Sequence, residues 1–219
     1  MPPPAQPAPR PFILVLAGVN GAGKSSIGGA MLQAHGLPWF NPDTCAREFA
    51  RLAGMAQEEA NPLAWQHGRE LLEAAIAQRR NHAFETTLGA NIIPSLLATA
   101  AKTHDVLMIF VGLSSPEQHV ERVGLRVASG GHPIPEEKIR ERWIGSRTNL
   151  IALLPCLARL QVFDNSAEAA PGEEIPQPLL VLELVRGKMV HPDAHDATAL
   201  ARIPAWARAV VQAAIEMQR

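Results

Sequence analysis

The sequence has little cysteine, almost no net charge and no long hydrophobic run. Its two cysteines, Cys45 and Cys156, lie far apart in the chain, so they do not form a disulfide framework and fit a reducing cytoplasm. The 219 residues carry a formal net charge of −1, which argues against a protein that binds nucleic-acid backbones. No apolar run is long enough to span a membrane, and the N-terminus does not have the pattern of a secretory signal. We therefore expect a cytoplasmic protein without a nucleic-acid or membrane partner.

What the sequence does contain is a phosphate-binding loop near its N-terminus. An apolar run at 12–17 leads into it as a predicted buried strand, and a helix is predicted to follow at 25–33. The P-loop pattern G-x-x-x-x-G-K-[ST] is matched by Gly18, Val19, Asn20, Gly21, Ala22, Gly23, Lys24 and Ser25, and Ser26 follows. A helix N-terminus at this place points backbone N–H groups at an anion. The context predicts a site for ATP or GTP, with Lys24 on the β- and γ-phosphates and Ser25 holding Mg²⁺.

Strand-like and helical segments alternate after this loop. Apolar runs predict strands at 12–17, 37–40, 82–87, 105–113 and 160–165. Helices are predicted between them, at 25–33, after 44 to about 51, and at 61–80, 91–102, 116–128 and 135–154. This alternation is typical of an α/β fold. We expect a doubly wound parallel sheet of the P-loop NTPase and kinase kind, with helices on both faces.

The chain is expected to divide into three parts. Residues 1–11 are rich in proline and alanine and predict a disordered tail. Residues 12–166 would form a P-loop kinase core that carries a helical lid at about 116–154. Residues 167–219 would add a small appendage packed on the core, made of a β-hairpin at 179–185 and 189–190 and an amphipathic helix at 204–218.

Two carboxylates follow different predicted strands and should meet at one edge of the sheet. Asp43 follows the second strand, and Glu85, with Thr86, ends the third; ligands of open parallel sheets bind beyond such strand ends. Asp43 is a candidate general base, although it could instead be only the N-cap of the helix that follows. A Glu at the end of an apolar strand must pair or coordinate, so Glu85 is expected to bind substrate, a Mg²⁺-bound water or a nearby arginine. The fourth strand ends without the aspartate that usually serves Mg²⁺ in P-loop ATPases, which gives more weight to Asp43 and Glu85.

Arginines gather on the two helices of the predicted lid. Arg122 and Arg126 lie four residues apart on one helix face, where an anion between them would offset their repulsion. The next helix carries Arg140, Arg142 and Arg147, and Gly130-Gly131 joins the two helices as a flexible connector. Cations on a mobile lid suit phosphoryl transfer, because they meet the charge that develops on the γ-phosphate. Interleaved glutamates leave the alternative of a solvated charged face open for any single arginine.

With these residues assembled, the chain resembles the zeta-toxin family of P-loop kinases, including its stand-alone bacterial members. The matching segments are 17–26 (AGVNGAGKSS), 41–43 (NPD), 84–87 (FETT), 126–135 (RVASGGHPIP) and 164–166 (DNS). The resemblance implies a kinase that transfers the ATP γ-phosphate to a hydroxyl, in studied members that of uridine diphosphate-linked N-acetylglucosamine, whose product poisons cell-wall synthesis. It also implies Asp43 as the base, Glu85 and Thr86 in acceptor binding, Lys24 on phosphate, lid arginines such as Arg122 and Arg126 on the transferring group, and an antitoxin protein as a further partner.

Two other functions stay open at this point. One is a kinase for a different small-molecule hydroxyl, such as that of a nucleoside or an antibiotic. The other is a nucleotide-binding module that switches or docks without transferring phosphate. Asp43 together with the lid arginines favours an enzyme, because a pure binder needs neither. An ABC-type transporter ATPase is disfavoured, because no Leu-Ser-Gly-Gly-Gln stretch occurs.

Overall fold

A computed structural model describes residues 9–29, 32, 36–169 and 172–218 of the chain. Most of the expected disordered tail, residues 1–8, lies outside these ranges, as do residues 30–31 and 33–35 of the first predicted helix and its end. The described part of that helix begins as a wide π-helical turn, η1 (Ser25–Gly29).

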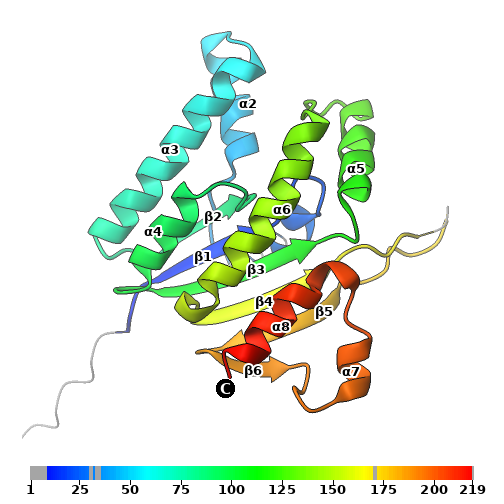
Figure 1. Cartoon of the computed structure of the whole chain (residues 1–219). Helices are drawn as coiled ribbons and strands as arrows, with labels where there is room; N and C mark the ends of the chain where they lie inside the picture. Colours follow the sequence, from blue (N-terminus) through cyan, green and yellow to red (C-terminus); the bar gives the residue numbers. More distant parts are fainter. Residues whose placement is uncertain (1–8, 30–31, 33–35, 170–171, 219) are drawn as a thin grey trace, which may run out of the picture.

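The fold is built on one six-stranded sheet with the order β2-β1-β3-β4-β5-β6 (Figure 1). The first four strands, in which the P-loop strand is central, run parallel to one another. β5 and β6 continue the sheet in the antiparallel direction. The strands are β1 (Phe12–Ala17), β2 (His82–Thr86), β3 (Asp105–Gly112), β4 (Arg159–Asp164), β5 (Leu179–Val185) and β6 (Lys188–His191). The C-terminal hairpin is therefore an extension of the central sheet.

The predicted second strand at 37–40 is wrong as a strand. Only Phe40 pairs with the sheet, through an isolated parallel bridge to Phe84 of β2. Its N–H donates to the Ala83 carbonyl at 2.9 Å, and its carbonyl accepts from the Glu85 N–H at 2.9 Å. The run is short and contains Pro38, which has no N–H to donate to a ladder. The bridge still brings the next residues to the carboxyl edge of the sheet.

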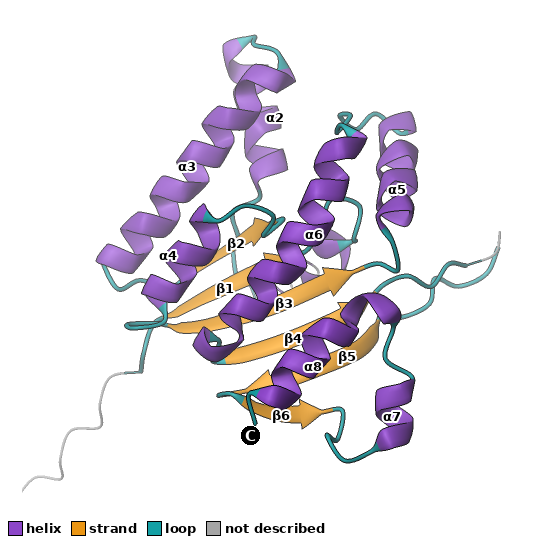
Figure 2. Cartoon of the chain, viewed as in Figure 1, coloured by secondary structure: helices purple, strands orange, loops and turns teal. Residues whose placement is uncertain are grey.

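Figure 2 shows a layer of helices over one face of the sheet, and the P-loop helix η1 packs on the opposite face. Ile13, Val15 and Ala17 of β1 point into the larger core, which α3, α4, α6 and α8 close. Leu16 points to the opposite face, into a smaller core with Ile27 of the P-loop helix. The helices are α2 (Pro42–Ala53), α3 (Gln57–Ala77), α4 (Ile92–Ala100), α5 (Pro116–Ala128), α6 (Glu136–Leu153), α7 (Ala197–Ala201) and α8 (Arg208–Glu216). This is the expected α/β P-loop arrangement, since successive β1 side chains alternate between two buried layers.

The C-terminal residues lock onto the end of β4. Trp206 lies in a short 3₁₀ turn, Ala205–Ala207, that precedes α8. It packs against Gly112, where an added Cβ would lie 2.3 Å from the indole, and its Nε1–H donates to Asp164 at 2.9 Å. The short helix α7 was not predicted; Asp196 caps it by accepting from the N–H groups of Thr198 and Ala199. Among the described residues, no helix is long and apolar enough to cross a membrane.

The two helices of the predicted lid differ in how they are anchored. α5 packs along α6 at the carboxyl edge of the sheet. The second half of α6 is part of the larger core, where Leu150 and Leu153 are buried. A closing motion of the whole 116–154 segment would therefore tear this core open, because buried leucines contribute several kcal/mol each. The lid stays a prediction for the segment that precedes the buried half of α6.

Candidate active site

The P-loop is folded for contact with an anion. Gly18, Gly21 and Gly23 all have positive φ angles, of 140°, 83° and 89°. At Gly18 a Cβ would lie 2.2 Å from the carbonyl oxygen of Val111, so only glycine fits this close approach to β3. Val19 and Ala22 bury their side chains in two different hydrophobic clusters, and these contacts anchor the loop to the core. The backbone is thus held in a left-handed cradle at a helix N-terminus, as a phosphate site requires.

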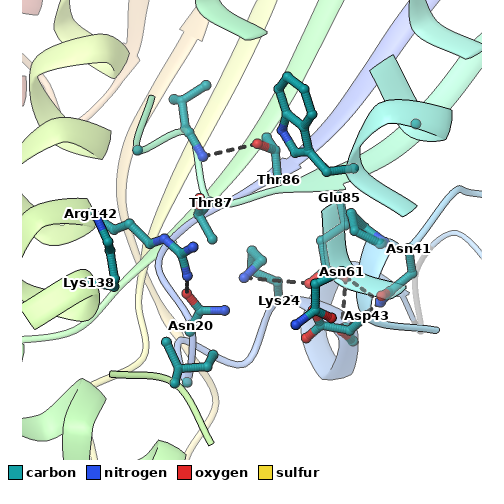
Figure 3. A pocket seen from close by; sticks show the side chains of 18 of the residues that line it. Asn20, Lys24, Asn41, Asp43, Asn61, Glu85, Thr86, Thr87, Lys138 and Arg142 are labelled. Carbon is teal, nitrogen blue, oxygen red and sulfur yellow. Dashed lines mark hydrogen bonds and ion pairs between the residues drawn. The ribbon is translucent and has the colours of Figure 1, made fainter. Parts of the chain in front are cut away.

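Glu85 is the hub of the side chains around Lys24. Its Oε1 lies 3.5 Å from the Lys24 ammonium, and both side chains are nearly buried, 11% and 7% exposed. Its Oε2 accepts from the Ser25 hydroxyl at 2.9 Å and from the Asn41 amide at 3.0 Å. Figure 3 shows Lys24, Asn41 and Glu85 beside one another among the side chains that line the cleft. The partner of Glu85 in this structure is thus the P-loop lysine, whose Nζ also reaches the Val19 carbonyl at 3.4 Å.

Asp43 is not the N-cap of its helix. Asn41 takes that place, and its side-chain oxygen accepts from the Thr44 N–H at 3.1 Å. Asp43 is the second residue of α2, directly after Pro42, where a carboxylate gains from the helix dipole. Its side chain is 42% exposed and pairs with Arg126 of α5 at 3.6 Å. Asp43 is therefore free of a capping role and lies in the wall of the cleft.

Thr86 and the residues after it form a tight turn at the end of β2. The Thr86 carbonyl accepts from the Gly18 N–H at 3.2 Å, which ties this strand end to the P-loop. Its hydroxyl accepts from the Leu88 N–H at 3.1 Å, and Leu88 has a positive φ of 56°. Asn149 of α6 donates to the Leu88 carbonyl at 2.9 Å. The turn is thus clamped between the P-loop and α6, and both Thr86 and Leu88 line the cleft.

The arginines of the predicted lid separate into two groups. Arg122, Arg126 and Arg142 line the cleft. Arg140 instead pairs with Glu117 and Glu136 at 2.6 Å on the exposed face of α6. Arg147 lies 3.4 Å above the ring of Trp143 and bonds to backbone carbonyls, which is a packing role. For Arg140 and Arg147 the alternative of a structural or solvated face is the one that the geometry supports.

The contacts at the end of α5 show why two glycines, Gly130 and Gly131, follow this helix. The Gly131 N–H donates to the Arg126 carbonyl at 2.9 Å, and a Cβ at Gly131 would lie 2.9 Å from Arg126 Cγ. The Arg126 guanidinium in turn lies 3.5 Å from the His132 carbonyl. Arg126 Nε is buried without a hydrogen-bond partner among the described residues. The Gly130-Gly131 turn thus folds against Arg126 and aims its guanidinium at the cleft.

Asn20 of the P-loop is clamped by both lid helices. His119 of α5 donates from Nδ1 to the Asn20 carbonyl at 2.8 Å. Arg142 of α6 donates to the Asn20 side-chain oxygen at 2.8 Å, as Figure 3 shows. Burial lowers the pKa of His119 to about 4, and the charges of Lys24 and Arg122 add to this, while the bond to Asn20 opposes it. Burial also lowers the pKa of Arg142, against the attraction of Asp43. Sequence reasoning missed His119, because nothing in its spacing marks it.

These elements enclose one cleft of about 610 Å³. One side of it is the P-loop, with Lys24, Ser25 and Ser26. The opposite side has apolar walls: Trp65 of α3 and Ile92 of α4 line the cleft although they are 42% and 44% exposed. Asn61 and Arg69 share the helix face of Trp65 at a spacing of four residues, a signal that could have predicted this wall. The residues predicted at β2, α2, α5 and the P-loop therefore line a common cleft.

Asn165, directly after β4, contacts the P-loop. Asn165 donates to the Ala22 carbonyl at 2.9 Å, and a Cβ at Gly23 would lie 2.6 Å from the Asn165 amide. Asp164 is taken up by Trp206 and by the Ser166 hydroxyl. Asp164, the carboxylate at the end of β4, is thus engaged in hydrogen bonds with Trp206 and Ser166.

Solved structures of similar architecture are known, although no curated protein matches the chain. The AvrRxo1-ORF1:ORF2 complex with ATP gives a TM-score of 0.66 at 16% identity, over 91% of this chain and 65% of that chain. This chain thus spans less than two thirds of that relative. A chain of the PezAT chromosomal toxin-antitoxin system of Streptococcus pneumoniae gives 0.52 at 16% identity, over 73% and 69% of the two chains. At such identities the likeness shows the fold.

The predicted fold class, an α/β P-loop NTPase fold, is confirmed by these structures together with the six-stranded sheet. The narrower resemblance to zeta toxins stays a prediction. A model of the AAA domain family (AAA_33) matches residues 13–143, more than half of the chain, and this match includes the P-loop, Asp43, Glu85 and the arginines of α5. The chain therefore belongs to the AAA domain family.

Proposed function

We propose that this protein is a phosphotransferase that moves the γ-phosphate of ATP, or of GTP, to a hydroxyl group of a small molecule. One observation carries the proposal. The P-loop lysine, a carboxylate without a capping role and cleft-facing arginines come from separate elements, yet they line a single cleft. Nucleotide binding alone explains Lys24, but it does not require Asp43 and Arg126 to pair at 3.6 Å in the wall of the same cleft.

The proposed roles follow from the chemistry of each group. The acceptor oxygen forms a bond to the γ-phosphorus while the bond from that phosphorus to the bridging β–γ oxygen breaks, so that the nucleoside diphosphate leaves. Asp43 takes the proton of the acceptor hydroxyl, for which its exposed carboxylate is positioned in the cleft wall. Lys24, Arg122 and Arg126 balance the negative charge of the transferring group. Arg142, which is held by Asn20, extends the same positive surface.

The oxygen atoms beside the P-loop suit a magnesium ion. The Ser25 hydroxyl and the Glu85 carboxylate lie 2.9 Å apart, and magnesium prefers such hard oxygen ligands. A bound magnesium ion would neutralise phosphate charge. Ser25 is therefore the proposed metal-binding residue of the P-loop.

The proposed acceptor is a ring-bearing molecule that fits the apolar side of the cleft. Trp65 and Ile92 there are large apolar side chains that remain 42% and 44% exposed, which supports contact with a ligand. The zeta-like version of the proposal makes the acceptor a UDP-linked N-acetylamino sugar, with Glu85 and Thr86 in its binding and an antitoxin as protein partner. The other version makes it a nucleoside or an antibiotic. A cytoplasmic location, where ATP is supplied, belongs to both versions.

Isotope transfer tests the proposal. A metabolite extract is incubated with the protein, Mg²⁺ and ATP whose γ-phosphate oxygens are ¹⁸O-labelled, and new labelled phosphate esters are sought by mass spectrometry. We expect one product class with wild type and with Arg140→Gln, a matched control because Arg140 lies outside the cleft lining. We expect none with Lys24→Ala. Binding of ATP without any labelled ester would instead support the nucleotide-binding module.

A further inference from the structure

Glu85 is a buried carboxylate whose charge is balanced by one cation. Among the described residues it forms a single ion pair, with Lys24 at 3.5 Å, and its side chain is 11% exposed. The other two partners, Ser25 and Asn41, are neutral donors. Removing one member of a buried ion pair is unfavourable, because an uncompensated charge stays in a poorly solvated place. Lys24 is therefore the group that makes the ionised Glu85 tolerable in this structure.

Nucleotide binding disturbs this balance. The P-loop lysine is the cation that meets the β- and γ-phosphates, so a bound nucleotide competes with Glu85 for it. The phosphates themselves bring further negative charge next to the carboxylate. At short range in a partly buried site, like charges repel by several-fold more than in bulk water. Glu85 should thus weaken the binding of a nucleotide that carries no metal ion.

A divalent cation at Ser25 removes this opposition. The Ser25 hydroxyl is within 2.9 Å of Glu85 Oε2, so a cation bound to the one lies close to the other. The other cleft carboxylate among the described residues, Asp43, is paired with Arg126 instead. At the end of β3 there is Gly112 and no acid, and Asp164 of β4 is taken by Trp206 and Ser166. Glu85 is thus the carboxylate that contacts the P-loop hydroxyl.

From these contacts we infer that Glu85 is a metal-coupling residue: it takes a divalent cation in exchange for Lys24, and thereby makes nucleotide binding depend on magnesium. The inference rests on the proposed nucleotide site. It assigns Glu85 a role different from acceptor binding. Asn41 is the positioning residue. Its side-chain N–H donates to Glu85 Oε2 at 3.0 Å, while its side-chain oxygen caps α2. A carboxylate held in this way keeps its second oxygen directed at Lys24 until the nucleotide arrives.

The test measures nucleotide affinity with and without metal. Binding of a fluorescent, non-hydrolysable ATP analogue is titrated in Mg²⁺ and in EDTA for wild type, Glu85→Gln and the matched control Glu183→Gln, which removes a paired carboxylate outside the cleft lining. We expect Mg²⁺ to raise the wild-type affinity by about tenfold or more, given the strength of short-range charge pairs in such sites. In Glu85→Gln the affinity in EDTA should rise above that of wild type, and the effect of Mg²⁺ should fall to about threefold or less. Glu183→Gln should behave as wild type.

The metal is also followed directly. Mn²⁺ stands in for Mg²⁺, and the fraction bound in the presence of the analogue is read from its electron paramagnetic resonance signal. Glu85→Gln should weaken this binding, and Glu85→Asp, which keeps the charge, should restore part of it. Equal Mg²⁺ dependence in wild type and Glu85→Gln would overturn the inference, and so would wild-type affinity that is the same in EDTA and in Mg²⁺, a result that needs no variant. Absence of any nucleotide binding would instead overturn the proposed function.

Discussion

Among the described residues two ion pairs join opposite elements of the cleft, and they differ in how far they are buried. Lys24 and Glu85 join the P-loop to the end of β2 with both side chains nearly buried. Asp43 and Arg126 join α2 to α5 with side chains that are 42% and 37% exposed. A buried pair is strongly coupled and hard to break, whereas water screens an exposed one. In the free protein the inner pair, Lys24 and Glu85, is therefore held tightly and would separate only where nucleotide and metal replace the two partners, whereas the outer pair, Asp43 and Arg126, can separate when an acceptor enters.

Breaking the inner pair should have the largest effect. In Lys24→Ala the phosphates lose their buried cation and Glu85 loses its partner, so we expect loss of detectable transfer and a decrease in the free energy of unfolding of about 3 kcal/mol. Chemical unfolding followed by fluorescence measures the second quantity. The double variant Lys24→Met/Glu85→Gln should recover most of that stability, because no charge remains unpaired. If Lys24→Ala proved as stable as wild type, the burial argument for the inner pair would be wrong.

Changing the outer pair should affect chemistry much more than stability. Asp43→Asn keeps the shape of the side chain but removes its basicity, so we expect phosphoryl transfer to fall by about two to four orders of magnitude. The free energy of unfolding should change by less than about 1 kcal/mol, because Asn41 supplies the N-cap and Asp43 adds only a dipole interaction and an exposed ion pair. Steady-state kinetics with the identified acceptor measures the rate. Transfer at the wild-type rate would remove Asp43 from the mechanism.

The clamp on Asn20 should make stability depend on pH. The pKa of His119 in the folded protein is about 4, below its ordinary value near 6.5, so the unfolded chain binds more protons between these values. The contribution of His119 to the free energy of unfolding is fully present above the ordinary pKa. It is lost as the pH falls through this window, by about 3 kcal/mol at most. His119→Asn retains a donor near the Nδ1 position without titrating, and should flatten that part of the curve. Parallel curves for the two proteins from about pH 7 to 4 would exclude this role.

The sequence predicted the strands and helices that local pattern determines. The P-loop, the apolar strand β3 and helix α5 follow from short-range signals, and the structure has them at or near the expected bounds. The 37–40 strand failed because a four-residue apolar run that contains Pro38 carries little pairing information. The hairpin, correctly placed in the sequence, was expected to pack as an appendage, and its pairing with β4 depends on long-range contacts.

The site was predictable to the level of strand ends but not of partners. That Asp43 and Glu85 reach one edge follows from sheet topology. Spacing in the sequence does not reveal side-chain rotamers. These rotamers decide that Glu85 contacts Lys24 and Ser25, and that Asn41 rather than Asp43 is the cap. The arginines show the same limit. Arg140 and Arg142 are two residues apart on one helix and therefore point to different sides, one to solvent-exposed glutamates and one to the P-loop.

The smallest expected effect is the coupling between Asp43 and Arg126 in the free protein. A double-mutant cycle of Asp43→Asn and Arg126→Gln compares the free energies of unfolding of the two single variants and the double variant. We expect a coupling energy below about 1 kcal/mol, since the atoms are 3.6 Å apart and both side chains are more than a third exposed. The same cycle on Lys24 and Glu85, with Lys24→Met and Glu85→Gln, should give a clearly larger value because that pair is buried. Equal couplings would contradict the division between a strongly coupled inner pair and a weakly coupled outer pair, and with it the expectation that acceptor entry opens the cleft on the Asp43 side.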